Sequence, residues 1–108
     1  MRVLIAILLA VLAFALPATA SPQESTSYNA SVIRHVFGVY GDQAVRVAWC
    51  ESRLHIWSRN GQYLGLFQMG SYARARYGHG WNAWVQSRAA YHYFRDSGRD
   101  WSPWSCKP

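Results

Sequence analysis

The sequence predicts a small, mainly α-helical domain with one short hairpin or extended segment. Three observations support this fold class. Apolar residues recur at helical spacing in several segments, glycines and an Asn-Gly pair gather between residues 58 and 70, and the chain has only 108 residues. A chain of this length forms one domain with a small hydrophobic core.

The first twenty residues have the three parts of a secretory signal peptide. Arg2 supplies the positive charge, residues 3–16 are apolar, and Ala-Thr-Ala at residues 18–20 is a small-residue cleavage site. The apolar run is shorter than the roughly 18 residues needed to span a bilayer. We therefore expect cleavage after residue 20 and secretion, with no membrane insertion afterwards. An uncleaved N-terminal anchor is the alternative.

The mature chain begins with a polar stretch and continues into helices. Residues 21–30 contain a proline and several serines and are expected to form a flexible tail, followed by a domain over residues 31–108. Residues 31–38 have apolar side chains at helical spacing and end at a glycine. A second helix is predicted over residues 43–54, with Asp42 as its N-cap.

The second half of the domain contains turn signals and the longest predicted helix. Residues 58–70 include the Asn-Gly pair and predict a turn with short extended structure. Residues 71–78 predict one or two helical turns. The longest helix runs from an Asn82 cap to a Gly98 stop, and residues 99–108 show no regular pattern.

Two cysteines, Cys50 and Cys106, remain in the exported chain. An even number of cysteines outside the cytoplasm predicts a disulfide, which would join the C-terminus to the middle of the domain. No group of cysteines and histidines has the spacing of metal ligands, so no metal site is expected.

Arginine dominates the positive charge of the chain. The net charge is +6, and ten of the eleven basic residues are arginines. Such a surface suits acidic polymers, although scattered charge of this size also serves solubility alone. No run of five or more Lys or Arg residues is present, which argues against a nucleic-acid partner.

Glu51 is a candidate catalytic residue because of its position on the predicted second helix. On a helical wheel it lies opposite Arg46 and Arg53, and its neighbours one turn back, Val47 and Ala48, cannot pair with a negative charge. Burial on an apolar face disfavours a charged carboxylate, and a general acid must retain its proton. The alternative is a glutamate that turns toward solvent or pairs with a distant arginine.

Four segments resemble a known family. AVRVAWCESRLH, NGQYLGLFQMG, WVQSRAAYHYF and WSPWSC, within residues 42–106, resemble the transglycosylase-like SLT domains of secreted bacterial proteins in the lysozyme-like superfamily. The resuscitation-promoting-factor domains are a more distant likeness. The most specific elements are Glu51-Ser52 and GLFQ at residues 65–68. The resemblance implies an α+β lysozyme-like fold and a wall-associated protein that binds peptidoglycan glycan strands.

The resemblance also implies roles for individual residues. Glu51 matches the catalytic acid/base, and the substrate-contacting candidates around it are Ser52, Tyr63, Gln68, Gln86 and Tyr91. Gln68 is expected to bind sugar or to orient Glu51. Tyr63 is expected either to stack on a sugar face or to pack in the core. Ser52 has no role beyond its place in the motif.

The chain departs from the family pattern after the GLFQ segment. Gln86 stands where many members have asparagine, and it either takes a cleft role or satisfies a backbone group. Tyr91 is a substitute for a cleft tyrosine of larger members. Trp101 and Trp104 lie beside the expected disulfide and either pack there or form a platform for sugar.

The number of carboxylates bears on the reaction. Hydrolytic glycosidases usually place two carboxylates around the scissile bond, and Glu51 has no obvious second partner among the five acidic residues. A monomeric lytic transglycosylase fits this count, because one glutamate cuts the MurNAc–GlcNAc β-1,4 bond and closes 1,6-anhydro-MurNAc without a cofactor. The alternatives are a hydrolytic muramidase and a non-catalytic, cationic wall-binding or toxin-like protein.

Overall fold

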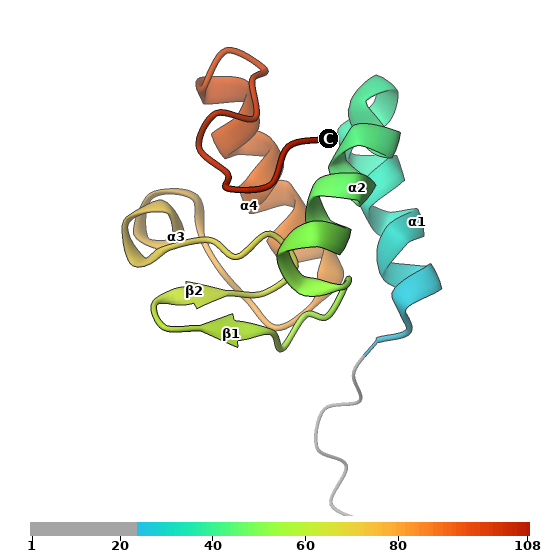
Figure 1. The fold of residues 1–108 in the computed structure, drawn as a ribbon, viewed down its shortest axis with the longest axis horizontal. Coiled ribbons are helices and arrows are strands. Elements are labelled where there is room, and N and C mark those ends of the chain that lie inside the picture. The colour runs from blue at the N-terminus through green and yellow to red at the C-terminus, as the bar shows by residue number, and fades with distance from the viewer. Residues whose placement is uncertain (1–23) are drawn as a thin grey trace, which may run out of the picture.

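The computed structural model describes residues 24–108, which form four α-helices, one 3₁₀ turn and one hairpin. Their order is α1 (Thr26–Phe37), η1 (Gly38–Tyr40), α2 (Gly41–Ser52), β1 (Arg59–Asn60), β2 (Tyr63–Leu64), α3 (Ser71–Tyr77) and α4 (Ala83–Asp96). Helices α1 and α2 lie side by side, and the hairpin and α3 lie on the other side of α2 (Figure 1). This confirms a mainly helical domain with one short hairpin. The predicted signal peptide lies outside the described residues.

Helix α1 begins earlier than the sequence indicates. Ser25 caps it by accepting a hydrogen bond from the backbone N–H of Tyr28, at 3.1 Å. Asn29 is fully buried, and its side-chain amide donates to the carbonyl oxygen of Leu54 at 2.9 Å. The expectation of a flexible tail over residues 21–30 is therefore wrong from Thr26 onward. The polar composition of residues 21–30 suggested a tail, but Asn29 is buried because it has a hydrogen-bond partner that is distant in sequence.

Helix α2 carries Glu51 in its last turn. Asp42 does not cap this helix, contrary to expectation, because the 3₁₀ turn leads directly into α2 and Asp42 already lies in its first turn. Its carboxylate instead accepts a hydrogen bond from Arg34 Nε at 3.1 Å. The helix ends at Ser52, since Arg53 adopts the left-handed conformation with φ 57°.

The hairpin and α4 follow the predicted signals. Asn60 pairs with Tyr63 across a tight turn that includes Gly61, which has φ 59°. Asn82 caps α4, because its side-chain oxygen accepts a hydrogen bond from the N–H of Val85 at 2.9 Å. Among the described residues, no helix is long and apolar enough to cross a membrane.

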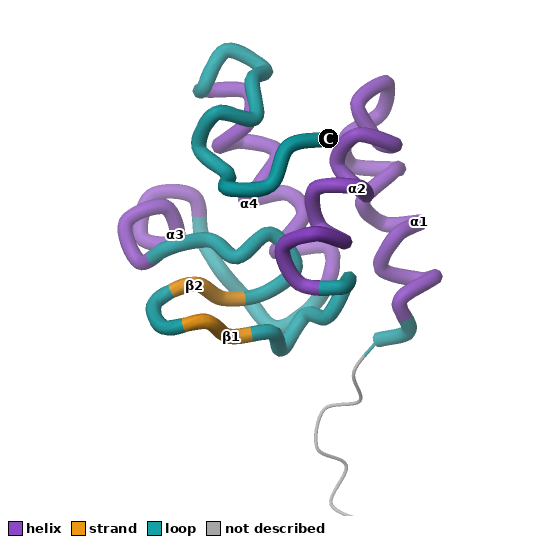
Figure 2. The backbone as a smooth tube through the Cα atoms, in the orientation of Figure 1, coloured by secondary structure: helices purple, strands orange, loops and turns teal. Residues whose placement is uncertain are grey.

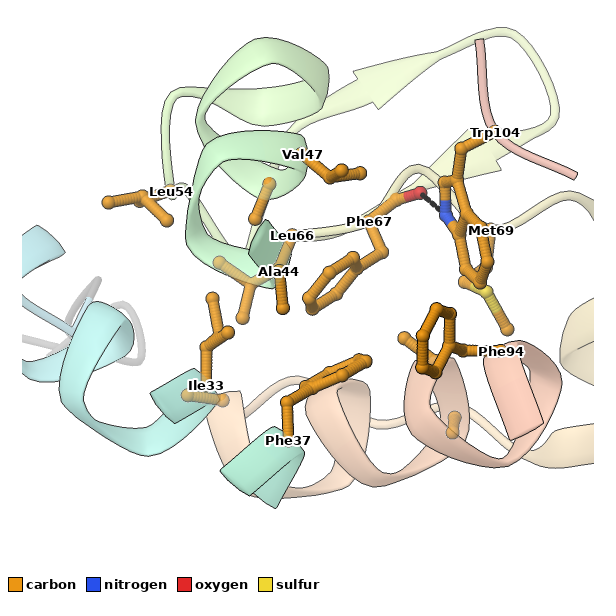
Figure 3. Packing of buried hydrophobic residues seen from close by; sticks show 14 of the residues in the cluster. Ile33, Phe37, Ala44, Val47, Leu54, Leu66, Phe67, Met69, Phe94 and Trp104 are labelled. Carbon is orange, nitrogen blue, oxygen red and sulfur yellow. Dashed lines mark hydrogen bonds between the residues drawn. The ribbon is translucent and has the colours of Figure 1, made fainter. Parts of the chain in front are cut away.

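The hydrophobic core lies between α1, α2, α4 and the segment after β2. Phe37 of α1 packs against Phe67, with the ring centroids 5.4 Å apart, and Phe94 of α4 completes this aromatic cluster (Figure 3). After α4 the chain is a loop that runs back toward α2 (Figure 2). Two tryptophans of this loop, Trp101 and Trp104, are buried at 7% and 5% exposure.

The final loop is held by side-chain contacts and by the predicted disulfide. Trp104 Nε1 donates to the carbonyl oxygen of Phe67 at 2.9 Å, the bond drawn in Figure 3. Cys50 and Cys106 form a disulfide, with their Cα atoms 5.9 Å apart and a sequence separation of 56. Both tryptophans therefore pack into the core, and the prediction of a disulfide is confirmed.

Candidate functional site

A cleft of about 530 Å³ lies between two parts of the chain. The end of α2 and the final loop form one wall, and the hairpin with the start of α3 forms the other. Its lining consists of Cys50, Glu51, Ser58, Asn60, Gln62, Tyr63, Gln68, Met69, Gly70, Tyr72, Ala73, Tyr93, Pro103, Trp104, Ser105 and Cys106. Amide, hydroxyl and aromatic side chains predominate in this lining, and the arginines of the described region lie outside it.

Glu51 is half-buried in the wall of this cleft. Its Oε1 accepts a hydrogen bond from the backbone N–H of Cys106, at 3.0 Å. Val47 and Ala48, one turn earlier, are fully buried, and no ion pair within residues 24–108 includes Glu51. The guanidinium group of Arg53 lies over the ring of Trp49 instead, 4.9 Å from its centroid. The prediction that the arginines of α2 leave Glu51 unpaired is confirmed.

The remaining four acidic residues are occupied elsewhere. Glu24 Oε2 accepts a hydrogen bond from the backbone N–H of Ala83 at the start of α4, and Asp42 pairs with an arginine. The hydroxyl of Tyr77 donates to Asp96 and holds the pKa of that carboxyl below its usual range. Asp100 accepts a hydrogen bond from the backbone of the final loop. Glu51 is thus the one carboxyl group of residues 24–108 that lines the cleft.

Gln68 also lines the cleft, and its side chain holds the loop that forms the wall. Its amide nitrogen donates to the carbonyl oxygens of Ser58 and Gly65, at 3.0 and 2.9 Å. These bonds stabilise a backbone with φ 47°, which is uncommon for a side-chain-bearing residue. No residue of the described region donates a hydrogen bond to its Oε1, so that atom can accept one from a molecule in the cleft.

Two tyrosines face solvent along the hairpin wall. Tyr63 is 45% exposed and Tyr72, the second residue of α3, is 72% exposed. A Cβ on Gly70 would lie 3.1 Å from the ring of Tyr63, so glycine leaves room for that ring. Sequence analysis missed Tyr72, because a seven-residue helix gives too short a pattern to show which side is exposed.

Ser52 lies behind the cleft. Its side chain is buried at 5% exposure, with its hydroxyl 3.0 Å from the carbonyl oxygen of Ala48 and 2.7 Å from that of Leu66. The contact with Leu66 joins the end of α2 to the GLFQ segment. Ser52 therefore fixes the relative position of two cleft-forming segments from within the core.

Gln86 also lies behind the cleft and connects three segments of the chain. Its Oε1 accepts from the backbone N–H of Leu66 at 2.8 Å, and its Nε2 donates to the carbonyl oxygens of Ile56 and Gly80 at 3.0 and 2.9 Å. The side chain is 4% exposed. Gly65 must lack a side chain here, because a Cβ would lie 2.5 Å from Gln86 Oε1. Gln86 was expected either to take a role in the cleft or to satisfy a backbone group. Its hydrogen bonds show that it satisfies backbone groups.

We expect Gln86→Leu to lower the free energy of unfolding by about 3 kcal/mol or more, because it leaves two buried backbone groups and one part-buried backbone group without their partner. Chemical denaturation measures the loss. Arg88→Gln is the matched control, since Arg88 is exposed on the same helix and should change stability by less than about 0.5 kcal/mol. A loss for Gln86→Leu as small as that of the control would contradict the structural role.

Tyr91 packs into the core rather than into the cleft. It is half-buried, and its ring meets the ring of Phe37 edge-on, with the centroids 5.4 Å apart. The structure thus brings Glu51, Tyr63 and Gln68 together at the cleft. It places the side chains of Ser52, Gln86 and Tyr91 outside the cleft lining.

The geometry of the cleft suits proton transfer to a bound molecule. A carboxyl group with one oxygen held by an N–H and the other without a partner among residues 24–108 can donate a proton and take one back. Within this region no group of three or more His, Cys, Asp or Glu residues is placed to hold a metal ion. Comparison of the chain with protein-family models, curated proteins and solved structures finds no match.

Proposed function

We propose that the protein is a secreted lytic transglycosylase that cleaves peptidoglycan glycan strands as a monomer, with Glu51 as its acid/base. The observation that carries this proposal is the position of Glu51, the one carboxyl group of residues 24–108 in a cleft whose lining consists mainly of amide, hydroxyl and aromatic side chains. Aromatic faces and uncharged polar groups match the chemistry of N-acetylated sugars. The disulfide supports an exported protein, since such bonds persist in oxidising compartments.

The proposed reaction uses Glu51 twice. Its carboxyl group first gives a proton to the glycosidic oxygen between N-acetylmuramic acid and N-acetylglucosamine, and the C1–O bond breaks as that oxygen leaves as a hydroxyl. The substrate's acetamido group stabilises the positive charge that develops at C1. The carboxylate then takes the proton of the C6 hydroxyl as that oxygen bonds to C1, which closes the 1,6-anhydro ring and restores Glu51. No water is consumed and no cofactor is needed.

Digestion of purified peptidoglycan, followed by mass spectrometry of the soluble products, tests the proposal. Anhydro ends are lighter than hydrolysed ends by one water molecule, so we expect products with the anhydro mass. Products with only hydrolysed ends would make the protein a muramidase. Retention on intact walls without any soluble fragment would make it a non-catalytic wall-binding protein.

We expect Tyr63→Ala to raise KM for glycan strands by about 3- to 10-fold with little change in kcat, because stacking on a sugar ring contributes to binding. Steady-state kinetics on soluble strands measure both constants. Tyr28→Ala is the matched control, because Tyr28 has nearly the same exposure, 44%, and lies on α1 outside the cleft. Equal effects of the two substitutions would rule out a specific role for Tyr63.

A further inference from the structure

The final loop brings a hydrogen-bond donor to the carboxyl group of Glu51. The backbone N–H of Cys106 donates to Glu51 Oε1 at 3.0 Å, from a residue 55 positions away in the sequence. We propose that Cys106 is a positioning residue, whose backbone N–H decides which oxygen of Glu51 carries the transferable proton. This inference rests on the proposed function, because it assigns a step of that reaction to a particular atom.

The position of this N–H is fixed by the disulfide. Cys106 is bonded to Cys50, the residue directly before Glu51, so the disulfide and the hydrogen bond close one ring through adjacent residues. Trp104 anchors the same loop, because its indole N–H donates a hydrogen bond to the carbonyl oxygen of Phe67 in the core. Lys107 Nζ donates a hydrogen bond to the carbonyl oxygen of Trp101 at 3.0 Å, which joins the residue after Cys106 to the earlier part of the loop. The donor therefore belongs to an anchored wall of the cleft.

A donor on Oε1 gives the two oxygens of Glu51 different roles. In the protonated acid the carbonyl oxygen is the better acceptor, so the N–H makes Oε1 the carbonyl oxygen and places the proton on Oε2. No residue of the described region is hydrogen-bonded to Oε2. After proton transfer the same N–H stabilises the carboxylate through a charge-assisted hydrogen bond. Oε2 is then also the oxygen that accepts the C6 hydroxyl proton, so one atom serves both steps.

The contact itself can be tested without any assay of activity. In ¹⁵N-labelled wild-type protein, the Cys106 amide proton is expected to shift as the Glu51 carboxyl titrates, since a carboxylate accepts more strongly than the acid. Glu51→Gln is the matched control, because its amide oxygen keeps an acceptor in place but does not titrate. A Cys106 amide that shifts equally in both proteins, or in neither, would overturn the inference even if the protein cleaves peptidoglycan.

The catalytic consequence is tested by a pair of variants that differ in one N–H. Cys50→Ala/Cys106→Ala lacks the disulfide but retains the amide at residue 106, whereas Cys50→Ala/Cys106→Pro lacks both. We expect the proline variant to have a kcat at least about 10-fold lower than the alanine variant, as for a lost hydrogen bond to a charged group, with KM equal within about 2-fold. If the loop were merely structural, the proline substitution would instead change KM, or the two variants would have equal kcat. Either result would refute a positioning role.

The two experiments separate failure of this inference from failure of the proposed function. If wild-type protein releases no anhydro fragments, the proposed function fails, and the amide titration still decides whether Cys106 holds Glu51. If wild-type protein releases such fragments and the alanine and proline variants have equal kcat, the function stands and the positioning role of Cys106 is wrong. The amide titration also requires no removal of the disulfide, so it stays decisive if the cysteine variants do not fold.

Discussion

Glu51→Gln is expected to lower the rate of fragment release from peptidoglycan by about 10²- to 10⁴-fold, the contribution of a general acid/base. Glutamine has nearly the same shape as glutamate, and its side-chain oxygen can still accept the hydrogen bond from Cys106. It has no proton to give at working pH and cannot take one back. The melting temperature should therefore change little while activity is lost, and release of soluble fragments together with thermal unfolding measures the two effects.

The matched control for this prediction is Glu24→Gln. Glu24 also has a carboxylate oxygen bonded to a backbone N–H, that of Ala83 at 3.1 Å, and it lies outside the cleft. The chemical change is the same and the local contact is of the same kind, so activity should remain near the wild-type level. If Glu51→Gln kept full activity, or if both variants lost it equally, Glu51 would not be the acid/base.

The features that follow from local chemistry were predictable from the sequence. The Asn82 cap and the hairpin turn each depend on residues within a few positions of one another, and the structure has both. The unpaired state of Glu51 was predictable for the same reason, because helical periodicity alone places the arginines of α2 on its other side. The disulfide followed from the count of two cysteines, which leaves a single possible pair.

The features that depend on tertiary contacts were not predictable in this way. Gln86 bonds to three backbone groups that lie 6, 20 and 30 residues away, and nothing near it in the sequence indicates those partners. The start of α1 depends on Asn29 reaching Leu54, 25 residues later. The Cys106 amide likewise meets Glu51 only because the final loop returns to α2. The sequence therefore indicates the carboxyl group that lines the cleft and does not indicate the backbone N–H that is hydrogen-bonded to it.

Loss of the disulfide is expected to lower the free energy of unfolding by about 4 kcal/mol, according to the chain-entropy model for a closed loop of this length. Cys50 is exposed and Cys106 is half-buried, so little apolar packing is lost with the sulfur atoms. The effect arises mainly because the bond restricts the unfolded chain. For a domain of this size, the melting temperature should fall by about 15 to 30 °C.

Thermal unfolding of wild-type protein with and without a reductant measures this loss. Cys50→Ala/Cys106→Ala is the control, because it should match the reduced wild type and show no further response to the reductant. A change below about 1 kcal/mol would mean that Trp101 and Trp104, with their hydrogen bonds to Gln43 and Phe67, hold the final loop without the bond. Aromatic packing would then hold the cleft wall and the Cys106 amide in position. The disulfide between Cys50 and Cys106 would not be needed for the hydrogen bond between Cys106 and Glu51.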